Sequence, residues 1–324
     1  MNIRATNSTP TIAVIGSFVI GVTVTLPRFP YPGETLEADA FDLGAGGKGN
    51  NLALAARRLG ASVVLVERLG SDMFADMAYS LYRDEGIDAT YVVRTENEQT
   101  GIGLVYLNAE GENQIGLYKG ANRFLSPSDI RAAEPALKDA ALMTIQLEVP
   151  DPAIEAALDV AERHGLRVIL NPAPARPLSH GILSRATVLT PNVCELFQLT
   201  GRAVPARPDR ETVAAAAGSL LVEYGIEAVV VTMGKDGALL VRRDLPVFHQ
   251  PPFPVKAVDT VGAGDSFNAG LAVALAQGLS YEGSVRRAAA SGALATTRLG
   301  VAGALPYRNE VEALLEQGGV QHEA

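Results

Sequence analysis

Short apolar runs alternate with amphipathic segments along most of this 324-residue chain. The runs are rich in Val, Ile and Leu, whereas the segments between them repeat apolar residues at the spacing of one helix face. Strands are predicted at 11–15, 62–67, 141–147, 167–170, 187–189 and 228–232, and helices at 49–59, 74–85, 152–164, 193–199 and 212–224. This alternation predicts a mostly parallel central sheet covered by helices on both faces, an α/β/α sandwich.

Two regions break the alternation. Residues 18–43 contain several prolines and residues 99–118 several glycines, and both regions alternate apolar and polar residues where a buried run is expected. We predict that both form antiparallel strands set apart from the main sheet, which together make a small β-sheet lid. Because the sequence contains no interdomain linker or internal repeat, residues 1–324 are predicted to form a single domain.

The composition excludes several classes of function. Apolar residues make up 48% of the chain and charged residues 19%, which is typical of a folded protein. The net charge of −9 argues against a surface that binds nucleic acid. The single cysteine, Cys194, rules out an internal disulfide and fits a reducing compartment. No run approaches the ~18 apolar residues of a membrane span, and the N-terminus lacks a signal-peptide core, so we expect a cytoplasmic protein without a membrane partner.

A glycine turn closed by an aspartate gives the strongest functional signal. A strand predicted at 255–258 and a helix predicted at 266–277 are joined through Gly262, Ala263, Gly264 and Asp265. Unpaired N–H groups at a helix start, with glycines that allow close approach, make a ready anion site. A carboxylate beside that site can accept a proton from the group that attacks the anion, as phosphoryl transfer to an alcohol requires. The alternative is an ordinary turn with Asp265 as the N-cap.

Several short motifs accompany this turn. They read PGET at 32–35, GGKGNN at 46–51, QLE at 146–148, NPAPA at 171–175, PNVCE at 191–195, TMGKDG at 232–237 and DTVGAGD at 259–265. In this order and at these separations they resemble the ribokinase-like carbohydrate kinase family, over about residues 11–315. The resemblance implies an ATP-dependent kinase that transfers the γ-phosphate to a primary hydroxyl of a pentose or related sugar. A nucleoside or ketohexose kinase of the same fold is the alternative.

The resemblance also implies roles for individual residues. Asp265 matches the catalytic base, and the amides of Gly262, Ala263 and Gly264 match the anion hole for the transferred phosphoryl group. Glu195 falls where the family organises Mg²⁺ through water. The residues matching the sugar-binding set are Val19, Gly21, Gly47, Lys48, Gly49, Asn51, Glu148 and Asp265, and those matching the ATP-binding set are Asn192, Thr232, Gly234, Lys235, Gly237 and Gly264.

A site for a monovalent cation is implied as well. The family holds K⁺ through one carboxylate and several backbone carbonyls, and the matching residues here are Asp259, Val261, Ala295, Arg298 and Gly300. Ala304 replaces a serine of the family pattern. K⁺ is therefore expected as an activator beside ATP and Mg²⁺. Exposed strand edges in a lid commonly need covering, and the resemblance implies the same, so a homodimer through the lid is expected.

The sequence departs from the family pattern just after the first predicted strand. Val19 and Gly21 stand where the family carries an Asn and an Asp that bind sugar hydroxyls. Each lost hydrogen bond is worth ~0.5–1.5 kcal/mol, and more if a partner stays buried and unpaired. Such a site either accepts a substrate that lacks those hydroxyls or has room for a bulkier one, unless neighbours such as Asn50 or Tyr118 replace the contacts. Ribose, deoxyribose, another pentose, a ketohexose and a nucleoside all remain candidates.

Two other classes of function fit parts of the sequence. Gly44, Gly46 and Gly49 match the spacing of a dinucleotide-binding fingerprint, with Glu67 about the usual ~20 residues further on. However, the segment before Gly44 does not resemble a buried strand, and an NAD-binding oxidoreductase leaves Asp265 without a role. A non-catalytic sugar or nucleotide sensor of the same fold is the other alternative, although a sensor has no need of a base.

Overall fold

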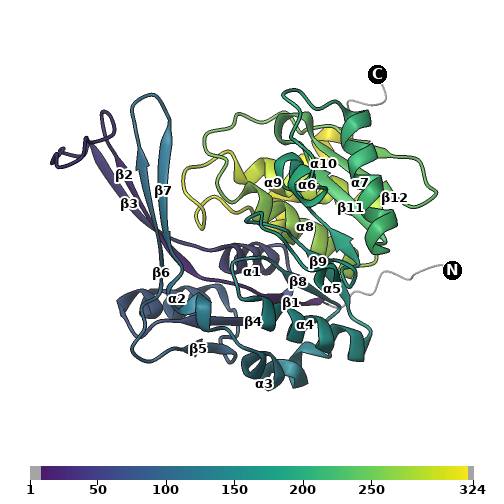
Figure 1. Ribbon diagram of the computed structural model, residues 1–324, viewed down its shortest axis with the longest axis horizontal. Helices are drawn as coiled ribbons and strands as arrows, with labels where there is room; N and C mark the ends of the chain where they lie inside the picture. The colour runs from purple at the N-terminus through teal and green to yellow at the C-terminus, as the bar shows by residue number, and fades with distance from the viewer. Residues whose placement is uncertain (1–8, 320–324) are drawn as a thin grey trace.

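The computed structural model describes residues 9–319 and contains two β-sheets (Figure 1). The larger sheet has nine strands in the order β13-β12-β11-β10-β9-β8-β1-β4-β5. Their bounds are β1 (Thr11–Ile15), β4 (Ser62–Leu69), β5 (Val92–Arg94), β8 (Leu142–Ile145), β9 (Arg167–Leu170), β10 (Val188–Leu189), β11 (Ala228–Thr232), β12 (Ala238–Arg242) and β13 (Phe248–Gln250). Every pairing from β5 to β11 is parallel, and the last two strands are antiparallel.

Helices cover both faces of this sheet. The α-helices are α1 (Lys48–Arg58), α2 (Met73–Glu85), α3 (Pro127–Leu137), α4 (Asp151–His164), α5 (His180–Leu183), α6 (Val193–Leu199), α7 (Arg210–Tyr224), α8 (Ala263–Ala276), α9 (Tyr281–Ala295) and α10 (Arg308–Gly319), and the short 3₁₀ helices are η1 (Gly120–Phe124) and η2 (Gly234–Asp236). Among residues 9–319, no helix has the length and hydrophobicity needed to cross a membrane.

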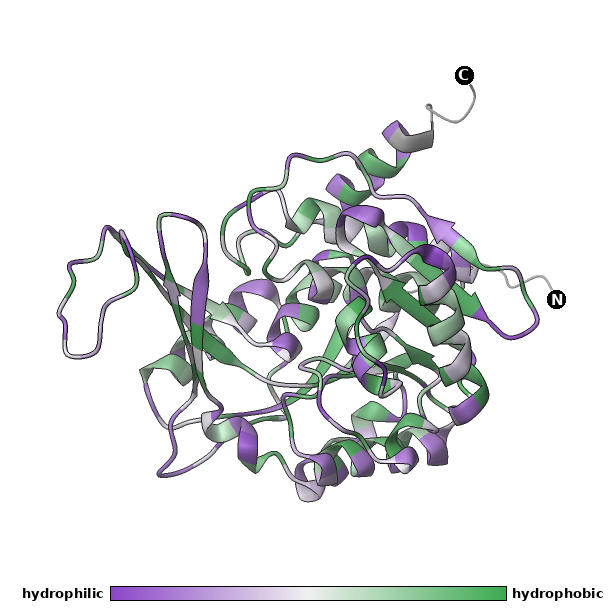
Figure 2. Ribbon diagram, turned by 45° about the horizontal axis from the view of Figure 1, so that its top comes forward, coloured by the Kyte–Doolittle hydropathy of each residue, from purple (hydrophilic) through white to green (hydrophobic). Residues whose placement is uncertain are grey.

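Two hydrophobic cores lie on opposite faces of the large sheet. Side chains alternate between the faces of a strand, so Ile12 and Val14 of β1 pack in one core while Ala13 and Ile15 pack in the other. The first core includes residues of α1, α2, α8 and α9, and the second includes residues of α3, α4 and α7. The hydrophobic strands therefore lie inside a shell of amphipathic helices (Figure 2), and the predicted α/β/α sandwich is confirmed.

The smaller sheet is the predicted lid, and it projects from the main body (Figure 1). Its strands are β2 (Val19–Thr25), β3 (Ala40–Gly46), β6 (Gly101–Leu107) and β7 (Asn113–Tyr118), in the order β3-β2-β6-β7. At the base of the lid, the Asn122 side chain accepts a hydrogen bond from the Phe18 amide at 3.1 Å and donates one to the Phe18 carbonyl at 2.7 Å. This side chain pairs with the Phe18 backbone as a neighbouring strand would.

The prediction of antiparallel pairing is wrong for the centre of the lid. β2 pairs with β3, and β6 with β7, in antiparallel hairpins, but β2 and β6 are parallel. The first strand of each hairpin leaves the main body in the same direction, so the two first strands meet side by side and run together. Since the hairpins lie far apart in the sequence, local patterns give no sign of this pairing.

The glycine turn also differs from its prediction. Residues 255–258 form no strand, and the Val258 amide donates instead to the Thr296 carbonyl at 2.7 Å. Helix α8 begins at Ala263, three residues earlier than predicted, because its N-cap Gly262 adopts φ 79° and turns the chain directly into the helix. Asp265 therefore lies in the first helical turn and is not the N-cap.

The backbones of Gly16 and Gly49 meet where the end of β1 touches the start of α1. A Cβ on Gly49 would lie 2.3 Å from the Ser17 nitrogen and 2.5 Å from the Gly16 Cα. Because both contacts are backbone atoms, neither can move aside as a flexible side chain can. We expect Gly49→Ala to lower the free energy of unfolding by about 1–3 kcal/mol, measured by denaturant titration.

A glycine inside α7 provides the matched control. A Cβ on Gly218 would meet no atom within 4 Å, so Gly218→Ala should raise stability by about 0.5–1 kcal/mol through its helix propensity. Equal effects of the two substitutions would show that the Gly16–Gly49 contact is not tight in solution.

Glu67 is a carboxyl group buried in the main body. The Tyr82 hydroxyl donates to its Oε1 atom at 2.5 Å, and its Oε2 atom has no partner among the described residues. Burial raises the pKa of Glu67 from 4.5 to about 8, against the opposing effect of the Tyr82 hydrogen bond. The folded protein therefore keeps a proton on Glu67 that the unfolded chain releases.

This proton makes stability depend on pH. Between the unfolded pKa of 4.5 and the folded pKa of about 8, the folded state binds more protons, so stability falls as the pH rises through this window. Glu67→Gln keeps the shape without the ionisation, and we expect its Tm to fall less than that of the wild type between pH 5 and about 8. The exposed change Glu223→Gln should leave the wild-type slope intact. An unchanged slope in Glu67→Gln would contradict the assignment.

Candidate active site

The start of α8 presents free backbone donors. The amide of Ala263 makes one long hydrogen bond, 3.3 Å to the Thr260 carbonyl, whereas the amides of Gly262 and Gly264 donate to no acceptor among the described residues. A Cβ on Gly264 would meet no atom within 4 Å, so open space lies in front of this turn. Free N–H groups at the positive end of a 14-residue helix suit an anionic oxygen.

Asp265 lies beside these donors and is almost fully buried, with 7% of its surface exposed. The Asn51 Nδ2 atom donates to its Oδ2 atom at 2.8 Å, and the Lys48 Nζ atom lies 3.9 Å from Oδ1. Burial raises the pKa of Asp265, while the Lys48 charge and the Asn51 hydrogen bond act in the opposite direction. The Asp265 charge in turn raises the pKa of Lys48. The pair therefore places a carboxyl group and a cation together in a largely dry site.

Glu148 contacts the backbone of Lys48. Its Oε2 atom accepts hydrogen bonds from the Lys48 amide at 2.9 Å and from the Ser17 hydroxyl. Gly47, the N-cap of α1, adopts φ 91°, and a Cβ there would lie 2.6 Å from the Ser17 carbonyl. The start of α1 thus brings Lys48 and Asn51 to Asp265 and brings the Lys48 amide to Glu148. The sequence analysis did not single out Ser17; its position directly after the first strand was the available signal.

One face of the lid has no polar side chain on the rungs of Val19 and Gly21. Val19 pairs with residues of β3 and β6, and Gly21 forms the next rung with the same two strands. Paired residues share a face of the sheet. The residues on these rungs are Val19, Gly21, Gly44, Gly46, Gly101 and Gly103. The opposite face carries Ile20, which is buried, and Val22, which packs against the main core. The Val19 face is therefore turned away from that core.

The residues predicted to bind ATP gather at the ends of β10 and β11. Asn192 forms a bridge with Thr232, and its side chain accepts a hydrogen bond from the Glu195 amide at 2.9 Å. Glu195 returns a bond to the Asn192 amide at 2.8 Å, which makes a capping box on α6. Gly234 and Lys235 lie in η2, and Gly237 follows it with φ 87°. Neighbouring strand ends in a parallel sheet are a common place for nucleotides.

Glu195 offers a carboxylate to a divalent cation on this side. Burial raises the pKa of Glu195, and the nearby Lys48 charge opposes that shift. The described part of the chain contains no cluster of three or more His, Cys, Asp or Glu side chains able to hold a metal ion. This donor set fits Mg²⁺, which keeps most of its waters and binds through one or two carboxylates and the substrate phosphates.

Asp259 ties two loops together at the predicted K⁺ site. Its carboxylate accepts hydrogen bonds from the Val261 amide at 3.0 Å and from the Gly300 amide at 3.1 Å. Within residues 9–319, the carbonyls of Val261, Ala295, Arg298 and Gly300 accept no hydrogen bond. Unused carbonyls next to a carboxylate suit a monovalent cation. Ala304 is buried and offers no side-chain oxygen.

The structure contradicts the dinucleotide-binding fingerprint. Gly44 and Gly46 lie in β3 of the lid, not at the end of a central strand. Glu67, which would bind the ribose, is buried against Tyr82. An NAD-binding oxidoreductase is therefore excluded at this motif.

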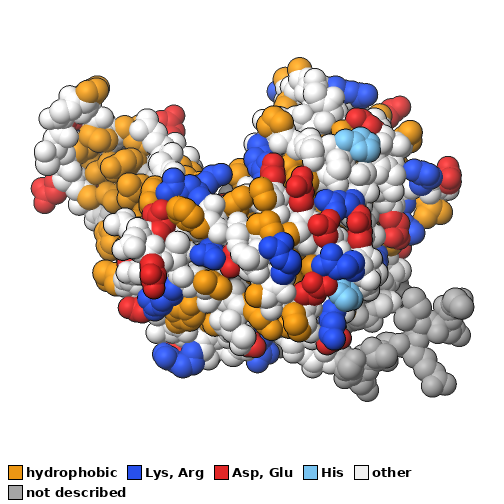
Figure 3. All heavy atoms as spheres, turned by 60° about the horizontal axis from the view of Figure 1, so that its bottom comes forward, with side chains coloured by type: hydrophobic (Ala, Val, Ile, Leu, Met, Phe, Trp, Pro, Cys, Tyr) orange, Lys and Arg blue, Asp and Glu red, His pale blue; other side chains and the backbone are white. Residues whose placement is uncertain are grey.

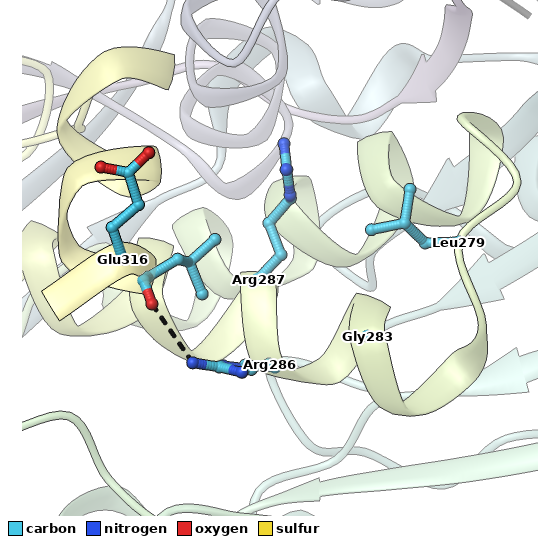
Figure 4. Close-up of a pocket in the computed structure, with 6 residues that line it drawn as sticks. Leu279, Gly283, Arg286, Arg287 and Glu316 are labelled. Carbon is cyan, nitrogen blue, oxygen red and sulfur yellow. Dashed lines mark hydrogen bonds between the residues drawn. The ribbon is translucent and has the colours of Figure 1, made fainter. Parts of the chain in front are cut away.

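Two cavities differ in their relation to the site. One cavity, of ≈ 340 Å³, lies between α9 and α10 (Figure 4). Arg286 there donates a hydrogen bond to the Leu315 carbonyl, and the Arg287 side chain points away from that bond. This cavity contains no residue of the predicted site. The other, of ≈ 490 Å³, is lined in part by Glu148 and therefore adjoins the site.

Comparisons with known proteins agree with this geometry. Residues 9–308 match the pfkB family of carbohydrate kinases. A deoxyribokinase from Salmonella typhi is 40% identical over 296 residues, which cover 91% of this chain and 95% of the relative. A ribokinase from Haemophilus influenzae is 36% identical over 306 residues, covering 94% and 98%.

Solved structures point the same way. Arabidopsis thaliana ribokinase, solved with ribose and ATP, superposes with a TM-score of 0.88 at 30% identity and covers 95% of this chain and 99% of its own. A nucleoside kinase from Methanocaldococcus jannaschii, at 19% identity and a TM-score of 0.77, shares the fold. The chain therefore belongs to the pfkB family of carbohydrate kinases, and it is an ATP-dependent sugar kinase with a ribokinase-like fold.

Proposed function

We propose that the chain phosphorylates a primary hydroxyl of a pentose or a closely related sugar, with Asp265 as the base. The observation that carries the proposal is the buried cluster in which Asn51 and Lys48 contact the Asp265 carboxylate beside the free amides of α8. Asp265 orients the hydroxyl and takes its proton as the hydroxyl attacks in line. The amides of Gly262, Ala263 and Gly264 stabilise the charge that develops on the phosphoryl oxygens.

The proposed ATP site runs from the ends of β10 and β11 toward Gly264. Asn192, Thr232, Gly234, Lys235 and Gly237 surround the nucleotide in this arrangement. Glu195 would hold Mg²⁺ through water, and the ion would supply positive charge to the phosphates of ATP. The Lys48 Nζ atom lies 3.9 Å from Asp265, so its positive charge also acts on the phosphoryl group that is transferred beside Asp265.

The lid is proposed to close over the acceptor and exclude water that would hydrolyse ATP. Glu148, Asn51 and the backbone around Gly47, Lys48 and Gly49 bind acceptor hydroxyls on the side of the main body. On the lid side, Val19 and Gly21 offer no side-chain donor or acceptor. A hydroxyl that faces this wall loses water without gaining a side-chain partner, so acceptors that lack such a hydroxyl are expected to be favoured over ribose.

Asp265→Asn tests the base directly. The amide keeps the shape and the Asn51 contact but cannot take a proton, so kcat should fall by ~10²–10⁴-fold with ATP binding nearly unchanged. Initial rates of ADP release give kcat, and calorimetry gives the affinity for Mg–ATP. A variant within a few-fold of the wild type would remove Asp265 from the mechanism.

The acceptor is identified by a panel of pentoses, deoxypentoses, hexoses and nucleosides, with Mg–ATP and K⁺ present and Asp265→Asn as the control. An acceptor whose turnover disappears in the variant supports the proposal. If the protein binds ATP and an acceptor tightly but turns over none, the sensor alternative is favoured.

K⁺ is proposed to bind between the Asp259 carboxylate and the unused carbonyls of Val261, Ala295, Arg298 and Gly300. A cation there would hold the loop before α8 against the loop after α9 and so order the anion site. Water would replace the oxygen that Ala304 lacks.

Removal of K⁺ should therefore lower activity. We expect kcat/KM to fall several-fold when K⁺ is exchanged for tetramethylammonium at constant ionic strength. Asp259→Asn should have low activity in both salts. Equal rates of the wild type in the two salts would contradict the K⁺ site.

A homodimer through the lid is proposed from its exposed hydrophobic side chains (Figure 3). Phe41, Leu43, Leu104 and Tyr106 alternate with the Val19 face along β3 and β6, so they share the opposite face of the lid. Phe41 is 66% exposed and Leu104 44% exposed. Exposed apolar patches of this kind commonly mark an interface.

A charge on this face should separate the subunits. Leu104→Glu is expected to sediment as a monomer at micromolar concentration, whereas the wild type sediments as a dimer. Val222→Glu, at an apolar residue of α7 that is 77% exposed and lies outside the lid, is the matched control and should remain dimeric. A monomeric wild type would rule out this proposal.

A further inference from the structure

Three buried polar side chains form a row between the large sheet and α8. Asn171 follows β9, Thr190 follows β10, and Asn268 lies in α8, with 8%, 1% and 2% of their surfaces exposed. Two residues earlier, Ile169 and Val188 fill the same face of these strands with apolar side chains. Burial of a polar group costs free energy unless the group finds a hydrogen-bond partner. A polar row directly after an apolar rung therefore indicates a role other than filling the core.

Hydrogen bonds connect this row to the start of α8. The Asn171 Nδ2 atom donates to the Thr190 carbonyl at 2.7 Å and to the Thr190 Oγ1 atom at 3.4 Å. The Thr190 hydroxyl donates to the Asn268 Oδ1 atom at 2.6 Å. The Asn268 Nδ2 atom donates to the Gly264 carbonyl at 2.8 Å. The row therefore runs from the end of β9 to the glycine turn before Asp265.

The last acceptor determines the direction of every bond in the row. A backbone carbonyl can only accept, so the Asn268 amide must turn its Nδ2 atom to Gly264 and its Oδ1 atom to Thr190. The Thr190 hydroxyl must then donate its only proton to that oxygen. Hydrogen bonds in series polarise one another in a low-dielectric interior. Loss of the hydroxyl would leave the Asn268 oxygen buried without this donor, and the side chain would no longer be held in one orientation.

The Gly264 carbonyl belongs to the peptide unit that joins Gly264 to Asp265. This unit is planar, so a bond that holds its oxygen also restricts the backbone from which the Asp265 carboxylate extends. The same glycine carries an amide that donates to no acceptor among residues 9–319. At the other end of the row, Thr190 lies two residues before Asn192 of the proposed ATP site. The row therefore connects the nucleotide side of the site with the amide donors and the base.

We infer that Thr190 and Asn268 are positioning residues for phosphoryl transfer. Through Gly264 they hold the start of α8, so that its free amides and the Asp265 carboxylate keep a fixed place relative to the nucleotide. The inference rests on the proposed function, because it assumes that these amides bind the transferred group. It also gives a role to Asn171, the first residue of the NPAPA motif, as a donor that orients Thr190.

Thr190→Val tests the inference, because it removes the hydroxyl and keeps the branched shape of the side chain. A displaced glycine turn weakens contacts made in the transition state more than contacts made with bound ATP. We expect kcat to fall by about 10–100-fold and the KM for Mg–ATP to change by less than about threefold, from initial rates of ADP release. Thr190→Ser keeps the hydroxyl and should restore kcat to within about threefold of the wild type.

Asn268→Leu tests the same link from α8, and it replaces Thr190→Val should that variant fail to fold. It removes both the acceptor for Thr190 and the donor to Gly264, so kcat should fall at least as far as in Thr190→Val. Because the two residues act in series, the double variant should lose no more kcat than Asn268→Leu alone. Full additivity of the two losses would show that the residues act independently and would overturn the inference.

Thr144→Val is the matched control. Thr144 also lies in the large sheet, is 1% exposed, and donates to a backbone carbonyl, that of Ala13, at 3.2 Å. The substitution is the same as at Thr190, but the lost bond joins two strands and does not lead to α8. Its kcat should stay within about twofold of the wild type. Equal losses of kcat in Thr144→Val and Thr190→Val would mean that the effect comes from the sheet in general and would contradict the positioning role.

Hydrogen exchange gives a measure that needs no turnover. The Ser266 amide closes the first turn of α8 on the Gly262 carbonyl at 2.9 Å. If the row holds this turn, peptides that cover residues 262–268 should exchange at least about tenfold faster in Thr190→Val, and within about twofold of the wild type in Thr144→Val. Unchanged exchange in Thr190→Val would overturn the inference, whatever the value of kcat.

Two results distinguish the inference from the proposed function. If the wild type phosphorylates an acceptor in an Asp265-dependent way and Thr190→Val is as active as Thr144→Val, the positioning role is overturned while the kinase assignment stands. If exchange at the start of α8 accelerates in Thr190→Val alone but no acceptor of the panel is phosphorylated, the hold of the row on the glycine turn is supported. In that case it is the proposed acceptor chemistry that fails.

Discussion

The close contact between the end of β1 and the start of α1 determines where the groups of the candidate site lie. Gly16 and Gly49 meet so closely that a Cβ on Gly49 would approach Ser17 to 2.3 Å. This contact fixes the first turn of α1, from which Lys48 and Asn51 extend to Asp265. It also sets the Lys48 amide on Glu148. One backbone contact therefore aligns Lys48 and Asn51 with Asp265 and the Lys48 amide with Glu148.

Burial and charge balance one another at Asp265. Burial raises the pKa of this carboxyl, whereas the Lys48 charge and the Asn51 hydrogen bond favour its ionised form. Glu67 shows the other result: it is equally hidden from water and has no cation to oppose burial, so its pKa rises to about 8. Two buried carboxyl groups therefore differ in what opposes their desolvation: a cation and an amide at Asp265, and one hydroxyl at Glu67.

Most of the large sheet could be predicted from the sequence, because β1 and its neighbours are buried on both faces and form continuous apolar runs. The parallel β2–β6 pairing could not, since it depends on how two distant hairpins leave the main body. The start of α8 was missed because a glycine with positive φ turned the chain earlier than the pattern of side chains suggested. For the site, the motifs supplied the residues, and Asn51 and Asp265 meet across 214 positions. The Ser17–Glu148 contact has no motif of its own, and its partners lie 131 positions apart.

The parallel centre of the lid has a mechanical consequence. Because β2 and β6 are joined along their whole length, the two hairpins form one stiff plate and not two independent flaps. Directly below that plate, the Asn122 side chain forms hydrogen bonds with both the backbone amide and the backbone carbonyl of Phe18. Any movement of the lid would then be concentrated at a single hinge line at its base. The outer hairpin tips would travel furthest, while Val19 and Gly101, which lie next to the hinge, would keep nearly the same distance from the candidate site.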